Sequence, residues 1–397
     1  MSVAQNHPCG SIWRKWDLHV HAPGTKKNDQ YESRPGTDPL EEYCARIEAS
    51  DVSAVGIADY FSADSYFTVV AKFRAKYQQS QKVLFPNIEL CTSDVVNAAS
   101  EEVNIHIIFN PFERDFESNI QQFLQHLETN ETQGPGGKQV KATDLKSEAD
   151  FQEATTTRER MKRAFDDTFG TKADLTEHVL IFAVAKNDGI RTKRGAKRKA
   201  LITDEVDKFS NGFFGNSNNT QHFLDPDRLD DKSKADPKPV ISGCDAHSFP
   251  DLDSWLGKLV LQNGVRIKEP TWIKADLTFE GLRQIIYEPG DRVFIGEEPD
   301  VEIRVRDNPR RYVSSVRINQ VKGYDGQHGA WFKNEDIPLN KELVAIIGNK
   351  GMGKSALTDI IGLLGNSHNQ KYERENRVEE LFPAFDNRRL KYRKQRV

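Results

Sequence analysis

The sequence predicts an α/β protein in which a barrel or parallel sheet precedes a nucleotide-binding segment. From residue 13 to about 295, short apolar runs alternate with stretches of helical period, which is typical of parallel sheets and (β/α) barrels. Histidines and carboxylates lie at or near the ends of several of these runs. A glycine-rich loop of the phosphate-binding type follows at residues 348–355.

Length and composition suit a protein of two domains. A chain of 397 residues is long for one domain, and 37% apolar residues allow a sizeable core. The formal net charge of −4 argues against a globally basic coat for nucleic acid. The four cysteines lie far apart without a CxxC pair, and no long apolar run or signal-like segment occurs. We therefore expect a cytoplasmic protein in a reducing setting, with no membrane partner.

Eight apolar or β-branched runs predict the strands of the first domain. They are residues 16–21, 54–58, 83–85, 103–109, 179–185, 240–242, 272–274 and 292–295. Helical periodicity between them predicts helices at 63–80, 116–128 and 279–288. Two polar stretches interrupt this pattern and predict long loops, at 130–157 and 188–238.

The character of the chain changes after Pro299, so we place a domain boundary near residues 298–302. The first domain is then expected to span 1–298, with insertions near 130–157 and 188–238, and the second to span 302–397. The second domain is expected to contain strands at 301–305 and 313–321, a hairpin at 323–329 and a fully buried strand at 343–347.

The GxxxxGKS motif predicts a nucleotide phosphate loop between the strand at 343–347 and a helix at 356–364. Its glycines would let backbone N–H groups curl around phosphate oxygens, Lys354 would neutralise the phosphates, and Ser355 would reach Mg²⁺. ATP and Mg²⁺ are therefore expected cofactors. The candidate binding residues are Gly348, Asn349, Lys350, Gly351, Met352, Gly353, Lys354, Ser355 and Ala356. The alternative is a glycine-rich turn with a chance match.

ATP hydrolysis is expected to need parts that this sequence lacks. After Ser355 no apolar strand ends in the acidic pair that would hold Mg²⁺ and orient water. We therefore expect the sequence to be the front part of a longer protein, or the missing parts to come in trans.

A constellation of histidines and carboxylates predicts a metal site in the first domain. On a strand, Asp17, His19 and His21 would share one face, and two neighbouring imidazoles suit a metal ion. Similar groups recur on later strands, and barrel enzymes collect such groups at the carboxyl-terminal rim. The candidate metal ligands are His19, His21, Asp59, Glu89, His106, Asp245 and His247. Each one taken alone has the alternative of a turn or capping residue.

The segments DLHVH, GIADY, NIEL, HIIFN and SGCDAH, in this order, resemble the PHP (polymerase and histidinol phosphatase) family. The resemblance implies a distorted seven-stranded barrel holding two or three Zn, Mn or Fe ions that activate water against a phosphoester. It matches His19 and His21 to the first ligand pair, Glu89 to a metal-bridging carboxylate and His106 to the next histidine. Asp245 and His247 match the final pair. The catalytic set it implies is His19, His21, Glu89, Asp245 and His247.

Two departures from that family pattern leave the activity of the barrel open. Asp59-Tyr60 stands where the family usually has Asp-His, and Lys186 stands where a histidine is expected after the fifth strand. The alternative is a catalytically degenerate scaffold in an ATP-gated protein that binds nucleic acid or a partner. A third reading is a small-molecule phosphatase.

The segments WIKAD, FEGL and YEP, followed by the phosphate loop, resemble the TrlF-like PHP-domain ATPases. That resemblance implies the N-terminal lobe of an ABC- or SMC-like ATPase head, a homodimer through the head, and a link to anti-phage defence. The leading hypothesis is a metal-dependent phosphoesterase, with a nuclease as its specific form, regulated by ATP. Six cations within 191–199 are interpreted either as a DNA or RNA contact or as a solvated charge run. Phe213, Phe214 and His222 are interpreted either as base-stacking residues or as anchors of their loop.

Overall fold

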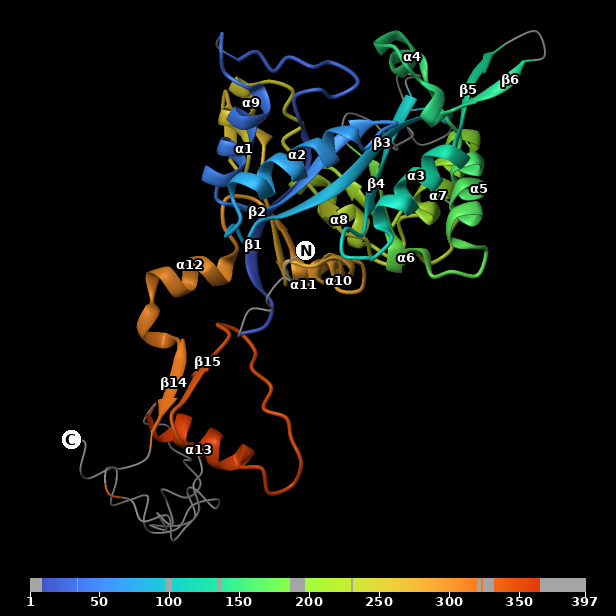
Figure 1. Cartoon of the computed structure of the whole chain (residues 1–397). Helices are drawn as coiled ribbons and strands as arrows, with labels where there is room; N and C mark the ends of the chain where they lie inside the picture. Colours follow the sequence, from blue (N-terminus) through green and yellow to red (C-terminus); the bar gives the residue numbers. More distant parts are fainter. Residues whose placement is uncertain are drawn as a thin grey trace. The chain divides into compact units, whose positions relative to one another are not determined.

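The computed structural model describes residues 9–33, 35–96, 102–133, 137–185, 197–229, 231–319, 323 and 332–364 (Figure 1). The chain divides into two compact units, Met1–Ile303 and Arg304–Val397. No helix in the described ranges is both long enough and apolar enough to cross a bilayer.

The first unit is built on one sheet of nine strands, in the order β13-β12-β1-β2-β3-β4-β7-β8-β9. All eight predicted strand positions are strands. The bounds are β1 (Ile12–His21), β2 (Val52–Tyr60), β3 (Val83–Val96), β4 (Glu102–Phe109), β7 (Val179–Val184), β8 (Gly212–Phe214), β9 (Val240–Ile241), β12 (Thr271–Ala275) and β13 (Val293–Ile295). The sheet nearly closes into a barrel, because β13 lies beside β9 and the Thr271 hydroxyl bonds to both the N–H and the carbonyl of Ser242.

Strand direction is mixed. β1, β2 and β3 run parallel, as do β7, β8 and β9, whereas β4 is antiparallel to both β3 and β7. β12 is antiparallel to β1 and to β13. The pairing of β1 with β2 shifts register between Asp17 and Val20. There the β1 backbone lies so close to Gly56 that a Cβ at that position would be 2.3 Å from the Leu18 carbonyl oxygen. Such irregularities in a sheet bend the strand and re-aim its side chains.

Helices cover the outside of the sheet. The longer ones are α1 (Pro39–Ala49), α2 (Asp64–Lys76), α3 (Phe116–His126), α5 (Arg158–Phe169) and α7 (Lys197–Phe209). Their apolar residues form the larger core with the strands. A second core takes Phe85, Ile108 and Phe182 from strands around the sheet and is joined by Phe279 and Leu282 of α10 (Phe279–Arg283). Shorter elements are α6 (Leu175–His178), α9 (Phe249–Trp255), β10 (Val260–Gln262), β11 (Val265–Lys268), η2 (Gln284–Ile286) and α11 (Pro289–Arg292).

Both stretches predicted as long loops contain regular structure. The first holds the hairpin β5 (Glu128–Gln133) and β6 (Lys138–Lys141), then η1 (Ala142–Asp144) and α4 (Glu148–Glu153). Ser147 and Asp150 form a capping box there, so residues that resembled loop formers start a helix. The second holds α7, β8 and α8 (Ser217–Leu224), and β8 is a full member of the central sheet. The two stretches are therefore not plain loops.

The predicted strand at 301–305 is wrong, because α12 (Asp300–Asp307) forms there. The helix carries Asp300 and Glu302 in its first turn and Arg304 and Arg306 in its last. Charges placed in this way stabilise a helix through its dipole, which outweighs the preference of the β-branched residues for a strand. It is followed by η3 (Pro309–Arg311) and by the antiparallel pair β14 (Ser315–Ile318) and β15 (Glu335–Pro338). The predicted hairpin at 323–329 lies outside the described residues except for Gly323.

The predicted helix after the phosphate loop is confirmed as α13 (Lys354–Leu364). The predicted buried strand at 343–347 is wrong. Leu343 is 86% exposed and Ile347 is 89% exposed, and no strand in the described residues pairs with this segment. A strand forms only where neighbouring backbone satisfies its N–H and C=O groups, and within the described ranges no backbone group pairs with residues 343–347.

Candidate metal centre

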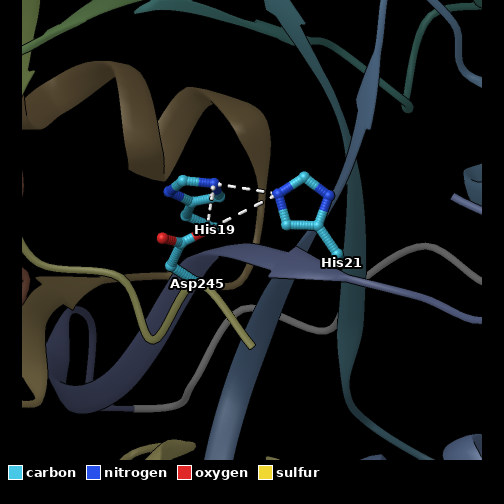
Figure 2. Close-up of side chains that lie close together, drawn as sticks. All are labelled: His19, His21 and Asp245. Atoms are coloured by element: carbon cyan, nitrogen blue, oxygen red, sulfur yellow. Dashed lines mark hydrogen bonds and ion pairs between the residues drawn. The ribbon is translucent and has the colours of Figure 1, made fainter. Parts of the chain in front are cut away.

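The end of β1 brings two histidines and one carboxylate together (Figure 2). The Nε2 atoms of His19 and His21 lie 3.2 Å apart. Asp245, in the loop after β9, places Oδ1 3.2 Å from Nε2 of His19 and 3.6 Å from Nε2 of His21. Both imidazoles are buried, whereas the Asp245 side chain is 50% exposed. Three potential ligand atoms therefore point at one place, which is open to solvent on the Asp245 side.

A second carboxylate reaches the same place from β3. Oε2 of Glu89 lies 3.3 Å from Nε2 of both His19 and His21. Glu89 pairs in register with His106 on β4, and His106 closes a second group of ligand atoms with His19 and Glu89. Oε2 of Glu89 and Nε2 of His106 are both buried without a hydrogen-bond partner in the described structure. Buried polar atoms are rarely left unpaired, so these two atoms point to a ligand that would bind between them.

The spacing of these atoms fits a bound divalent cation. The triangles His19–His21–Asp245 and His19–His21–Glu89 have sides of 3.2 to 3.6 Å. Ligand atoms bound tetrahedrally at ~2.0–2.1 Å are separated by about 3.3 Å. Without a cation or extra protons, these lone pairs and carboxylate oxygens would repel one another. The residues therefore fit a metal such as zinc, manganese or iron.

The partner of His21 fixes which of its nitrogens carries a proton. The Thr25 hydroxyl donates to Oδ1 of Asp59 at 3.2 Å, so its oxygen is free to accept from Nδ1–H of His21 at 3.2 Å. That arrangement leaves Nε2 of His21 as a lone pair aimed at the site. Asp59 therefore supports His21 through Thr25.

His106 and His247 are oriented in the same way. The Asn87 amide donates to the Leu18 carbonyl at 2.8 Å, which turns its oxygen toward Nδ1 of His106 at 3.2 Å. Nδ1 of His247 lies 3.1 Å from the carbonyl oxygen of Asn28, which can only accept. Each imidazole thus donates from Nδ1 and offers Nε2. Metal-ligating histidines typically show this pattern of support.

The loop after β9 is fastened onto β1. The backbone N–H of Cys244 donates to both carboxylate oxygens of Asp17, at 3.1 and 3.2 Å, and the N–H of Asp245 donates to the His19 carbonyl at 2.8 Å. A Cβ at Gly243 would lie 2.4 Å from Cβ of His19, so the close approach needs glycine. Asp245 itself adopts φ of 54°, a conformation that aspartate tolerates better than most residues. Asp17 therefore holds the loop that carries Asp245.

Burial and charge set the protonation of the site. Burial alone would lower the pKa of His19, but the carboxylates of Asp245 and Glu89 raise it above its ordinary value. Burial lowers the pKa of His21, and it lowers the pKa of His106 to about 3. Burial opposes the charge of Glu89 and of Asp245, but the surrounding imidazoles hold the pKa of both carboxyls below the usual range. The site therefore keeps two carboxylates and at least one neutral imidazole near neutral pH.

The structure brings most of the candidate ligands together but treats three positions differently. Asp59 joins neither group of ligand atoms, because its oxygens accept from Thr25, Lys26, Tyr60 and Ser65. His106 does not come from a carboxyl-terminal rim, because it lies within β4, which runs antiparallel to its neighbours. His247 lies beside Asp245, with Nε2 3.5 Å from Oδ1.

Several predicted features lie elsewhere or outside the described residues. Phe213 is fully buried, and Phe214 packs its ring against His19 and His106 with centroids 5.4 and 4.5 Å away, so neither is free to stack a base. His222 lies on α8 against Phe223. Lys186 and most of the basic run at 191–199 lie outside the described residues.

Sequence reasoning missed the residues that support the ligands. Thr25, Asn87 and Asn104 orient His21, His106 and Glu89 respectively, and Asn104 does so by donating a hydrogen bond from Nδ2 to Oε1 of Glu89. The available signal was strand periodicity, because Asn87 and Glu89 share one face of β3. Asn104 and His106 share one face of β4 in the same way, whereas Thr25 had no comparable signal.

The glycine-rich segment at 348–355, predicted to bind phosphate, lies in the second unit. Gly348, Gly351 and Gly353 have φ of 152°, 87° and 84°, values open mainly to glycine. The Lys354 ammonium turns back onto the carbonyls of Gly348 and Asn349, at 2.6 and 2.9 Å. Lys354 begins α13, so Ser355 and Ala356 lie in its first turn. Lys350 and Met352 are exposed.

No protein-family model matches the sequence, and no curated protein matches it. Among solved structures, the chain is similar to a two-domain protein from Bacteroides vulgatus that contains a predicted PHP-like metal-dependent phosphoesterase. That pair is 12% identical with a TM-score of 0.38, and the match covers 79% of this chain and 74% of the other.

Two further structures are similar. One is a candidate metal-dependent phosphoesterase from Bifidobacterium adolescentis, at 14% identity and a TM-score of 0.26, over 60% of this chain and 89% of that chain. The other is an amidohydrolase from Chromobacterium violaceum with bound sulfate and no metal, at 14% identity and a TM-score of 0.31, over 72% of this chain and 99% of that chain. TM-scores of this size carry no functional conclusion, so the chemistry rests on the geometry of the residues above.

Proposed function

We propose that this protein is a metal-dependent hydrolase that cleaves phosphoesters. The observation that carries the proposal is the convergence of His19, His21, Glu89 and Asp245 from three separate segments: each carboxylate lies 3.2 to 3.6 Å from Nε2 of both histidines. A bound divalent cation would polarise a phosphoryl oxygen and lower the pKa of a bound water. The resemblance of the DLHVH-to-SGCDAH motif series to the PHP family supports phosphoesters as the substrate class.

The residues divide the work by their exposure. Glu89 and His106 are buried and hold the inner side of the site. Asp245 is half-exposed, so substrate would approach from its side. His247 stands beside Asp245 at this opening, with its Nδ1 bound to a carbonyl. We assign proton transfer at this opening to His247, because His106 is fully buried. Nε2 of His247 would accept the proton that the attacking water loses and then give it to the leaving oxygen.

Metal content and hydrolysis together test the proposal. Purified protein would be loaded with Mn²⁺, Zn²⁺ or Fe²⁺, its bound metal measured by mass spectrometry, and its hydrolysis of p-nitrophenyl phosphate and bis(p-nitrophenyl) phosphate followed. We expect stoichiometric metal and turnover in the wild type, and loss of both in His19→Ala and Asp245→Ala. His222→Ala, on a helix with no candidate ligand, is the matched control. Failure of wild-type protein to retain any metal would sink the proposal.

A second candidate is a degenerate PHP scaffold that binds without catalysis. It is favoured by Tyr60, which replaces a family histidine, and by Asp59, whose oxygens are engaged by neighbouring donors. Stoichiometric metal without hydrolysis of either ester would select this candidate.

We also propose that ATP with Mg²⁺ binds the phosphate loop and regulates the metal centre. The phosphoester substrate would then be a phosphodiester of DNA or RNA. The ATPase heads would pair as a homodimer. The glycine conformations at 348, 351 and 353 and the inward Lys354 support the nucleotide part. Equilibrium binding of ATP to wild type and to Lys354→Ala tests it, with Lys350→Ala as the matched control in the same loop. Nuclease assays with and without ATP, and mass by light scattering, test the remainder. Equal ATP affinity in wild type and Lys354→Ala would exclude this regulation.

A further inference from the structure

The cation of Lys27 lies one aromatic ring away from the candidate metal centre. Its Nζ is 4.5 Å from the centroid of the Tyr60 ring. The Tyr60 ring in turn stacks on His21, with centroids 4.9 Å apart and an interplanar angle of 16°. His21 stacks on His247 at 4.0 Å. An ammonium group over an aromatic face is held there electrostatically, so Tyr60 provides a defined seat for Lys27.

The backbone around Lys27 is tied to the site. The next residue, Asn28, accepts from Nδ1 of His247 at 3.1 Å, and the preceding residue, Lys26, donates its N–H to Asp59 at 2.8 Å. A few residues later, the Tyr31 hydroxyl lies between the carbonyls of His21 and Ala246, at 2.8 and 3.0 Å. Lys27 is therefore on a segment that is fixed on both sides at the opening beside His247.

Charge distinguishes Lys27 from its neighbour. The Lys26 ammonium is paired with Asp64 at 2.7 Å. Lys27 forms no ion pair with any described residue. The carboxylates of Glu89 and Asp245 would cancel the charge of one divalent cation, so a loaded site would have little net attraction for an anion. An additional cation at the opening supplies that attraction, and Lys27 is placed to do so.

We propose that Lys27 recognises the phosphoryl group of the substrate, and that Tyr60 is the positioning residue that holds Lys27 beside the opening of the site. This inference rests on the proposed phosphoester hydrolase and names its specificity determinant. Because the interaction is with charge on the phosphoryl oxygens, a dianionic monoester depends on Lys27 more than a monoanionic diester does.

Binding of inorganic phosphate tests the inference separately from catalysis. Isothermal titration of Mn²⁺-loaded protein with phosphate would compare wild type, Lys27→Gln, Lys27→Arg and the control Lys26→Gln, with metal content checked in each. We expect Lys27→Gln to lower the affinity for phosphate by about 10-fold or more, which corresponds to the loss of one hydrogen bond to a charged group. Lys27→Arg and Lys26→Gln should stay near the wild type.

Two substitutions of Tyr60 test the contributions of its ring and its hydroxyl separately. Tyr60→Phe keeps the ring and should retain phosphate affinity, whereas Tyr60→Leu removes the seat and should weaken it several-fold. In steady state with p-nitrophenyl phosphate, Lys27→Gln should change KM more than kcat. Wild-type affinity for phosphate in Lys27→Gln, or no phosphate binding by wild type, would overturn the inference. A third outcome separates the two proposals. If the wild type binds phosphate but hydrolyses neither ester, and Lys27→Gln loses phosphate binding, the role of Lys27 stands and the proposed hydrolase activity does not.

Discussion

Replacing Thr25 by valine tests whether the ligand geometry depends on the support behind it. Thr25 is 6% exposed and joins Nδ1 of His21 to Oδ1 of Asp59 through its hydroxyl, at 3.2 Å on each side. Valine has nearly the same shape but no hydroxyl. Asp59 keeps its backbone donors from Lys26 and Tyr60, at 2.8 and 2.9 Å, so the main loss falls on His21.

The size of the effect follows from what is left unpaired. Nδ1–H of His21 would be buried without an acceptor, which costs about 1–3 kcal/mol. The proton could instead move to Nε2, which would remove the lone pair aimed at the site. Loss of such outer support typically lowers metal affinity ~10- to 100-fold, equivalent to about 1.4–2.8 kcal/mol.

Competition between the protein and a chromophoric chelator for Zn²⁺ measures that affinity, and urea unfolding of metal-free protein measures the stability term. Thr25→Ser restores the hydroxyl and serves as the matched control. If Thr25→Val binds Zn²⁺ within twofold of Thr25→Ser, the link from Asp59 through Thr25 to His21 does not orient the ligand.

Three further outcomes follow from other contacts. Asp207→Asn breaks a buried pair in which Arg228 donates to both carboxylate oxygens, at 2.7 and 2.8 Å, and should cost about 3–5 kcal/mol of unfolding free energy in urea at pH 7. Burial would raise the pKa of Asp207, but Arg228 and Lys238 lower it overall. The ionised carboxylate therefore stabilises the fold above the unfolded pKa of about 3.9, and this stabilisation disappears as pH falls through the lower folded pKa. If the difference in unfolding free energy between wild type and Asp207→Asn does not shrink at lower pH, this explanation is wrong. Gly243→Ala places a methyl 2.4 Å from Cβ of His19, so it should cost about 1–3 kcal/mol of unfolding free energy and displace His19. The displacement should appear as lost Zn²⁺ binding, and an unchanged Zn²⁺ affinity would refute the close approach. Metal present at 100 times its Kd should stabilise the wild type by about 2.7 kcal/mol. Chelating that metal should therefore lower the unfolding temperature of the wild type and leave that of His19→Ala unchanged.

Strand periodicity and motif order carried much of the prediction. Apolar runs located the eight strands predicted for the first domain, because a buried strand must be apolar wherever it lies in the sheet, but similar runs at 301–305 and 343–347 do not form strands. The alternation in β1 also put His19 and His21 on one face, which depends on local backbone geometry alone. The long polar stretches were misjudged, since Ser147 can cap a helix or occupy a loop, and burial of Phe151 decided between them.

Local sequence patterns were enough to identify the residue types that reach the site: the imidazoles of His19 and His21, the carboxylate of Glu89, and the Asp245–His247 pair after a short apolar run. Tertiary structure decided what each of them does. Pairing of β4 antiparallel to β3 sets His106 opposite Glu89, and the approach of Thr25 to Asp59 makes that carboxylate a support for His21. Local patterns follow from the chain's own geometry, whereas strand direction and the partner of a buried hydroxyl depend on contacts between segments far apart in sequence.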